Sequence, residues 1–111
     1  MIVDDEAVIA DVVEEALRRH GYTTQSRTSS AEAMKFFEQD PSGIDLVFAD
    51  QTMPSMTGIE LAKRMLAIRP NLPIVLFTGF SDHLVASAAE AIGVRALLKK
   101  PVSFAVLLRT T

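Results

Sequence analysis

The sequence predicts an α/β fold in which a five-stranded parallel sheet carries helices on both faces. Short apolar runs alternate with longer helical patterns along the chain, which is the order expected when a helix follows each strand. The runs Ile44–Ala49 and Pro73–Thr78 are almost continuously apolar, as is typical of parallel strands buried on both faces. This alternation favours a doubly wound sheet with strand order 2-1-3-4-5 and right-handed crossovers.

Five short apolar segments, bounded by turn residues, carboxylates or helical patterns, are expected to form the strands. They are Met1–Asp4, Tyr22–Arg27, Ile44–Ala49, Pro73–Thr78 and Val94–Lys99. Helices are expected over residues 6–19, from Ser29 to the turn at residues 40–43, over residues 57–68, over residues 81–92, and from Ser103 to Thr111.

Local signals support the helix boundaries. The first helix has apolar residues at spacings of three and four, which predicts a buried face made of Ile9, Val12, Val13, Ala16 and Leu17. Gly21 suits the end of this helix. Ser29 with Glu32, and Thr57 with Glu60, have the spacing of a capping box at a helix start.

Composition narrows the class of protein. The chain has 111 residues, of which 49% are apolar, so it can form one folded domain. We expect residues 1–111 to be a domain taken from a longer chain, because the first strand and the last helix are shorter than usual. The net charge of -3 argues against a nucleic-acid surface, and no apolar run is long enough to cross a membrane. Without cysteine there are no disulfides or thiolate sites, and a cytoplasmic location is expected.

Carboxylates follow two strands that the predicted topology places side by side. Asp4 and Asp5 end the first strand, and Asp50 ends the third. Because ligands bind beyond the carboxyl ends of the strands where the strand order reverses, we expect these side chains to crowd one pocket. Carboxylates this close together repel each other, and a bound cation would offset the repulsion. Mg²⁺ takes carboxylate and phosphate oxygens as ligands. A simpler interpretation stays open for Asp4–Glu6, which could be no more than an acidic helix start.

The next two strand ends carry groups suited to binding a phosphoryl group. Thr78 and Gly79 end the fourth strand, and Lys100 ends the fifth. Mg²⁺ and Lys100 would neutralise phosphoryl oxygens, while Thr78 and backbone N–H groups would donate hydrogen bonds to them. A carboxylate can accept phosphorus and form an acyl phosphate, and Asp50 lies at the centre of the group.

Four motifs stand in order at the predicted strand ends: "VDDE", "FADQTMPSMTG", "FTG" and "LLKKP". With them the chain closely resembles, over essentially its whole length, the response-regulator receiver domain of two-component signalling, which has a flavodoxin-like fold. The resemblance implies that Asp50 is the phosphorylated aspartate. It implies that Asp5 binds Mg²⁺ directly and that Asp4 does so mainly through water. Asp50 and the backbone carbonyl of Thr52 would be the other protein ligands.

The resemblance also implies roles at the remaining strand ends. Thr78 would bind a phosphoryl oxygen and shift on activation, with Gly79 beside it. Lys100 would pair with Asp50 and then with the phosphoryl group. A cis peptide would precede Pro101, in keeping with the preference of cis bonds for proline.

One position departs from the family pattern. Many receivers carry Tyr or Phe three residues before the lysine, where the ring turns inward as the threonine moves, but this chain has Leu97. Leucine has no ring edge or hydroxyl for such a switch. This leucine, together with "TMPSMTGIELAKRM" and "GVRALLKKPVS", most resembles receivers of hybrid sensor histidine kinases.

The implied partners are a histidine kinase or a histidine phosphotransfer domain, and a homodimer is also allowed. We expect no contact of this domain with nucleic acid or membrane. The domain is expected to phosphorylate itself rather than to be an enzyme, and the parent chain is expected to be a protein histidine kinase. The donor domain is expected to dock where the first helix exposes Ala7, Val8 and Asp11, beside residues 101–104.

Alternatives remain open. The chain could belong to a stand-alone or effector-linked response regulator, or it could be an interaction module that is never phosphorylated. The full set of acidic, hydroxyl and amine residues disfavours the second of these. An enzyme or flavin carrier on the same fold is disfavoured because no glycine-rich phosphate loop follows the first strand.

Overall fold

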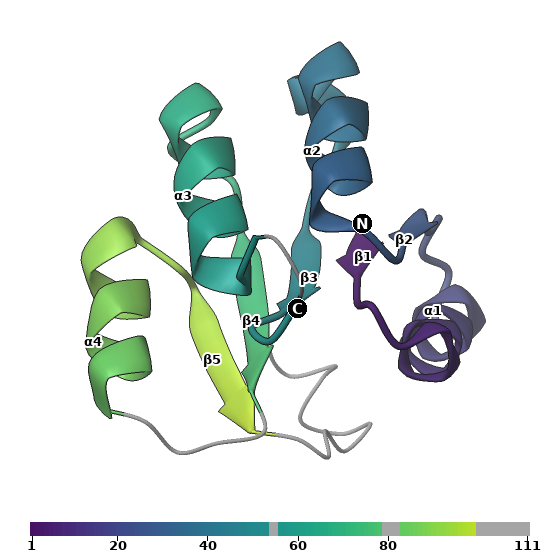
Figure 1. Ribbon diagram of the computed structural model, residues 1–111. Coiled ribbons are helices and arrows are strands. Elements are labelled where there is room, and N and C mark those ends of the chain that lie inside the picture. The colour runs from purple at the N-terminus through teal and green to yellow at the C-terminus, as the bar shows by residue number, and fades with distance from the viewer. Residues whose placement is uncertain (54–55, 79–82, 100–111) are drawn as a thin grey trace.

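The computed structural model describes residues 1–53, 56–78 and 83–99. It contains a five-stranded parallel sheet in the order β2-β1-β3-β4-β5, which confirms the predicted topology (Figure 1). The strands are β1 (Ile2–Val3), β2 (Ser26–Arg27), β3 (Val47–Asp50), β4 (Ile74–Thr78) and β5 (Ala96–Lys99). The helices are α1 (Ala7–Arg19), α2 (Ser30–Gln39), the short 3-10 helix η1 (Pro41–Gly43), α3 (Gly58–Ile68) and α4 (His83–Ile92). The helix expected from Ser103 to Thr111 lies outside the described residues.

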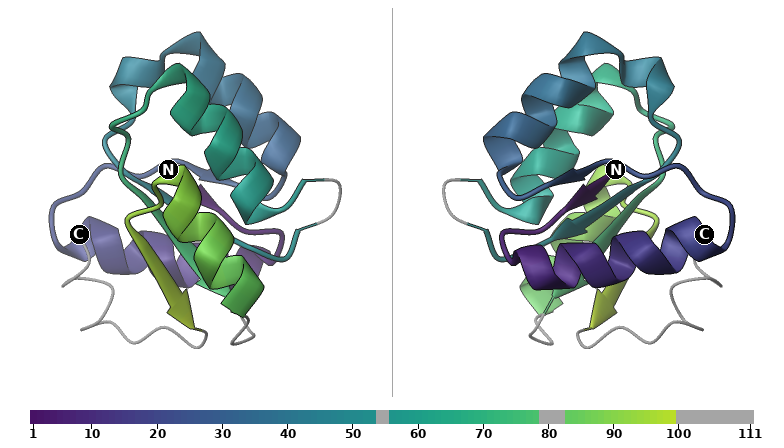
Figure 2. Two further views of the ribbon diagram at one scale, coloured as in Figure 1. Left: turned by 90° about the vertical axis from the view of Figure 1, so that its left-hand side faces the viewer. Right: turned by 90° about the vertical axis from the view of Figure 1, so that its right-hand side faces the viewer.

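The sheet separates two apolar clusters. On one face α1 packs against Ile2, Phe48, Val75 and Phe77, and on the other face α2, α3 and α4 cover Val3, Ala49 and Leu76 (Figure 2). Every residue of β3 and β4 is buried, as their continuous apolar sequences predicted. The rings of Phe48 and Phe77 stack with centroids 5.7 Å apart under α1.

The first two strands are shorter than expected. β1 is limited to Ile2–Val3, and β2 comprises only the last two residues of the predicted segment Tyr22–Arg27. The reason is that β2 has β1 as its neighbour, and the ladder between them joins Ile2 to Ser26 and Val3 to Arg27. Residues 22–25 have no further strand residues of β1 to pair with, although the Gln25 carbonyl still accepts a hydrogen bond from the Ile2 N–H at 2.7 Å.

One residue of the predicted buried face of α1 is exposed. The helix buries Ala10, Val13, Ala16 and Leu17, but Val12 is 62% exposed. At 3.6 residues per turn, Val12 lies on the flank of the stripe centred on Val13, so it is turned away from the sheet. Val8, one turn earlier, is 75% exposed, as predicted for the outward side of this helix.

The helix boundaries follow the predicted local signals. Gly21 has a φ of 88°, a left-handed conformation that glycine adopts without steric cost, and the N–H of Tyr22 returns to the Leu17 carbonyl at 3.1 Å. Thr57 and Glu60 form a complete capping box at the start of α3. Among the described residues, no helix is long and apolar enough to cross a membrane.

Candidate functional site

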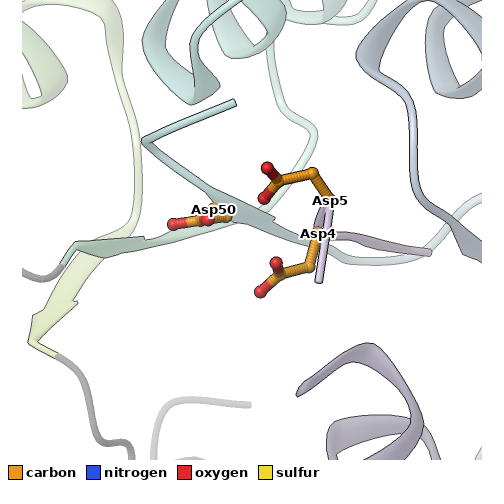
Figure 3. Close-up of side chains that lie close together, drawn as sticks. All are labelled: Asp4, Asp5 and Asp50. Carbon is orange, nitrogen blue, oxygen red and sulfur yellow. The ribbon is translucent and has the colours of Figure 1, made fainter. Parts of the chain in front are cut away.

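Three carboxylates converge where β1 and β3 end. Val3 pairs with Ala49, so the next residues along the two strands, Asp4 and Asp50, lie side by side. One oxygen from each of Asp4, Asp5 and Asp50 lies within 4.8 Å of the others. Figure 3 shows the three side chains pointing to the same side of the strand ends. The strand order therefore brings together residues that are 45 positions apart in the sequence.

The burial of this carboxylate cluster is uneven. Asp4 is 1% exposed and Asp50 is 3% exposed, whereas Asp5 is open to solvent. Backbone N–H groups offset part of the charge, since Glu6 N–H donates to Asp4 Oδ1 at 2.9 Å and Thr52 N–H donates to Asp50 Oδ1 at 3.4 Å. Burying carboxylates this close together is unfavourable without a compensating positive charge.

The donor set fits a hard divalent cation. Mg²⁺ binds one or two carboxylates and keeps several waters or phosphate oxygens, so it needs protein ligands on one side only. Asp4 and Asp50 would supply buried oxygens to such a cation, and the exposed Asp5 would leave the site open to water. The three carboxylates are therefore the residues that would hold Mg²⁺.

A hydroxyl residue ends the neighbouring strand. Asp50 pairs with Phe77 of β4, so Thr78 lies one residue further along the strand next to β3. Thr78 is 5% exposed. The end of β4 thus places a hydroxyl group beside the strand that carries Asp50, on the side away from β1.

A protein-family model described as "Response regulator receiver domain" matches residues 1–111. The chain belongs to this family of receiver domains. The match covers every element described above.

Curated relatives include transcription regulators and a phosphotransferase. The chain is 33% identical over 100 residues to the C4-dicarboxylate transport transcriptional regulatory protein DctD of Rhizobium meliloti, covering 90% of this chain and 21% of that protein. It is 28% identical over 101 residues to the sporulation initiation phosphotransferase F of Bacillus subtilis, covering 91% of this chain and 80% of that protein. The chain spans between 21% and 44% of the length of DctD and of the response regulator SaeR, so it corresponds to part of those proteins.

Solved receiver structures have the same fold. A response regulator receiver domain protein from Clostridium thermocellum superposes with a TM-score of 0.93 at 28% identity, covering 98% of this chain and 86% of that one. The chemotaxis protein CheY4 of Vibrio cholerae superposes with a TM-score of 0.90 at 27% identity, covering 98% of this chain and 91% of that one.

The other predicted site residues divide into two groups. Thr52 is exposed immediately after β3, and Leu97 is half-buried on β5, where it pairs with Leu76 and packs on the apolar cluster under α2, α3 and α4. Gly79, Lys100 and Pro101 lie outside the described residues, so their roles stay predictions.

Sequence reasoning missed one residue at this receiver site. Gln51 follows Asp50 directly, and its side-chain Oε1 accepts a hydrogen bond from the Ile59 N–H at 2.8 Å. Gly58, at the start of α3, is also in close contact with the end of β3: a Cβ built there would be 2.6 Å from the Asp50 carbonyl oxygen. A polar residue between a buried strand and a helix start seven residues later is the only sequence signal for this contact.

Proposed function

We propose that the chain is the phosphoacceptor receiver domain of a two-component phosphorelay, in which Asp50 takes a phosphoryl group from a phosphohistidine and so acts as a signalling switch. The observation that carries the proposal is the carboxylate cluster of Asp4, Asp5 and Asp50 at the carboxyl edge of the sheet. A binding module alone has no need to bury two acidic side chains against a third.

The proposed reaction is a displacement at phosphorus. An oxygen of the Asp50 carboxylate forms a bond to phosphorus while the bond between phosphorus and the donor imidazole nitrogen breaks, and the imidazole nitrogen keeps the electron pair. Later a water oxygen attacks the same phosphorus, inorganic phosphate leaves, and the carboxylate is restored. The burial of Asp50 at the end of β3 supports its role, because a fixed nucleophile loses little entropy on reaction.

Neighbouring groups would stabilise the transferred phosphoryl group. When bound by Asp4, Asp5, Asp50 and the backbone carbonyl of Thr52, Mg²⁺ would supply charge neutralisation for the phosphoryl oxygens. The Thr78 hydroxyl and the backbone N–H of Gly79 would donate hydrogen bonds, and Lys100 would contribute a positive charge. Thr78 would move toward the phosphoryl group. Leu97 would occupy the position on β5 where many receivers carry Tyr or Phe, so the switch would work without an aromatic ring.

The test is incubation with acetyl phosphate and Mg²⁺, followed by measurement of the intact mass. The wild-type chain is expected to gain the mass of one phosphoryl group. Asp50→Asn and wild-type protein with EDTA are expected to show no gain. If the wild-type chain gains no mass over a range of Mg²⁺ and acetyl phosphate concentrations, the protein is instead an interaction module that is never phosphorylated.

We also propose that the domain acts in the cytoplasm within a hybrid sensor histidine kinase and receives its phosphoryl group from a histidine kinase or histidine phosphotransfer domain. The sequence around Thr57 and the leucine at position 97 support this subtype. DctD and SaeR are named as regulators, which keeps an effector-linked response regulator as the alternative. The full-length gene decides between them: a kinase core upstream supports the first, and an effector domain downstream supports the second.

A further inference from the structure

Gln51, the residue after Asp50, uses three hydrogen bonds to join three elements. Its N–H donates to the Phe77 carbonyl of β4 at 2.7 Å. Its carbonyl accepts from the Gly58 N–H at 3.1 Å, and its side-chain Oε1 accepts from the Ile59 N–H at 2.8 Å. Gln51 therefore ties the end of β3 to β4 on one side and to the start of α3 on the other.

The start of α3 depends on two acceptor residues. The first four N–H groups of a helix have no partner inside the helix. In α3 the first two are bound by Gln51, while those of Glu60 and Leu61 are bound by the hydroxyl and the carbonyl of Thr57 at 3.2 and 2.9 Å. Both residues cap the same helix, but only Gln51 is joined to Asp50 by a peptide bond.

The backbone that carries Asp50 is in close contact with α3. A Cβ at Gly58 would lie 2.6 Å from the Asp50 carbonyl oxygen and 3.0 Å from the Gln51 Cα. On the other side, the Thr52 N–H donates to Asp50 Oδ1 at 3.4 Å. The peptide units on both sides of Gln51 are thus held by the helix start and by the carboxylate itself.

We propose that Gln51 is a positioning residue of the phosphorylation site. Its bonds to α3 hold the backbone of residues 50–52, and so they orient the Asp50 carboxylate and the Thr52 carbonyl toward a bound divalent cation. This inference rests on the proposed function, because it takes the carboxylate cluster as the cation site. Hydrogen bonds that orient metal ligands typically change metal affinity by about 10- to 100-fold when they are lost. If Gln51 only caps α3, its loss changes stability and leaves cation affinity unchanged.

The experiment compares the two capping residues. Gln51→Leu keeps the side-chain volume but removes the acceptor, and Thr57→Ala removes the other cap without altering the link to Asp50. The Mg²⁺ dissociation constant of each variant is measured by titration calorimetry, together with hydrogen exchange of the Ile59 amide by NMR. Gln51→Leu is expected to weaken Mg²⁺ binding about tenfold and to speed exchange at Ile59. Thr57→Ala is expected to lower the urea midpoint and to change Mg²⁺ binding less than about twofold.

Gln51→Glu serves as the rescue variant. Its carboxylate can still accept from the Ile59 N–H, and a negative charge at a helix start is favourable, so Mg²⁺ binding is expected to equal or exceed that of the wild type. If Gln51→Leu does not fold, Gln51→Asn, whose side chain is too short to reach Ile59, gives the same comparison.

The inference is overturned by unchanged Mg²⁺ affinity in Gln51→Leu, or by an equal loss of affinity in Gln51→Leu and Thr57→Ala. Absence of Mg²⁺ binding by the wild-type chain also overturns it. A wild-type chain that binds Mg²⁺ but gains no phosphoryl group contradicts the proposed function alone, and the comparison of Mg²⁺ affinities still decides the role of Gln51.

Discussion

At the scale of single residues, Gly58 is a position with no room for a side chain. The atoms nearest to a new Cβ there belong to the backbone of Asp50 and Gln51, which cannot rotate away. Adding a methyl group would push α3 away from the end of β3. The end of β3 and the start of α3 are therefore in direct backbone contact at Gly58.

Gly58→Ala is predicted to lower the free energy of unfolding by about 1–3 kcal/mol because of this overpacking. Urea denaturation followed by circular dichroism measures the change. Gly43→Ala is the matched control, since its Cβ would meet the side chain of Asp40, which can turn aside. Equal losses in the two variants would show that the contact with Asp50 is not the cause.

At the scale of the elements, α1 has an apolar outer side beside the carboxylate cluster. Val8 is 75% exposed and Val12 is 62% exposed, and a spacing of four residues makes them neighbours on the helix surface. Ala7 and Asp11 are exposed on the same helix, next to the strand end that carries Asp4. The donor domain is predicted to dock on this face, and the exposure of Val12 extends the predicted surface by one residue.

Val8→Glu is predicted to slow phosphotransfer from the partner histidine domain by about tenfold or more, because it places a charge in an apolar contact. The rate of phosphorylation by acetyl phosphate is expected to stay within about twofold of the wild type, since Val8 is not part of the carboxylate cluster. Both rates can be followed on phosphate-affinity gels. Equal loss in the two assays would reject α1 as the docking surface. Lys63→Glu, on the exposed side of α3, controls for a change of charge alone.

At the scale of the whole molecule, the carboxylate cluster exists only in the folded chain, because the sheet brings Asp4 and Asp5 to Asp50. A cation that binds there must therefore stabilise the fold. At a Mg²⁺ concentration 100 times the dissociation constant, the stabilisation is about 2.7 kcal/mol.

Mg²⁺ is predicted to raise the melting temperature of the wild-type chain by roughly 10 °C under those conditions. Differential scanning calorimetry with and without EDTA measures the shift. The shift is expected to be much smaller in the double variant Asp5→Asn/Asp50→Asn. An undiminished shift in that variant would place the cation elsewhere on the molecule.

The strand order and the carboxylate cluster could be predicted because both follow from local patterns: apolar runs that alternate with helical segments, and carboxylates at the ends of those runs. Apolar runs ending in aspartate locate Asp50, and the topology then brings it to Asp4. Val12 was assigned to the wrong side of α1 because an apolar residue on the flank of a stripe satisfies the same spacing as a buried one. Gln51 was missed because a side chain that binds backbone N–H groups eight residues away leaves no periodic pattern.

The stacked rings under α1 have a practical consequence for spectroscopy. Phe48 lies two residues before Asp50, and Phe77 lies directly before Thr78, so each ring belongs to a strand that ends at the site. The chain has no tryptophan, and its single tyrosine follows the far end of α1. Ring-current shifts from this phenylalanine pair therefore offer an NMR signal, without any added label, for structural changes at the carboxylate cluster. Neither tryptophan nor tyrosine is there to report such changes by intrinsic fluorescence.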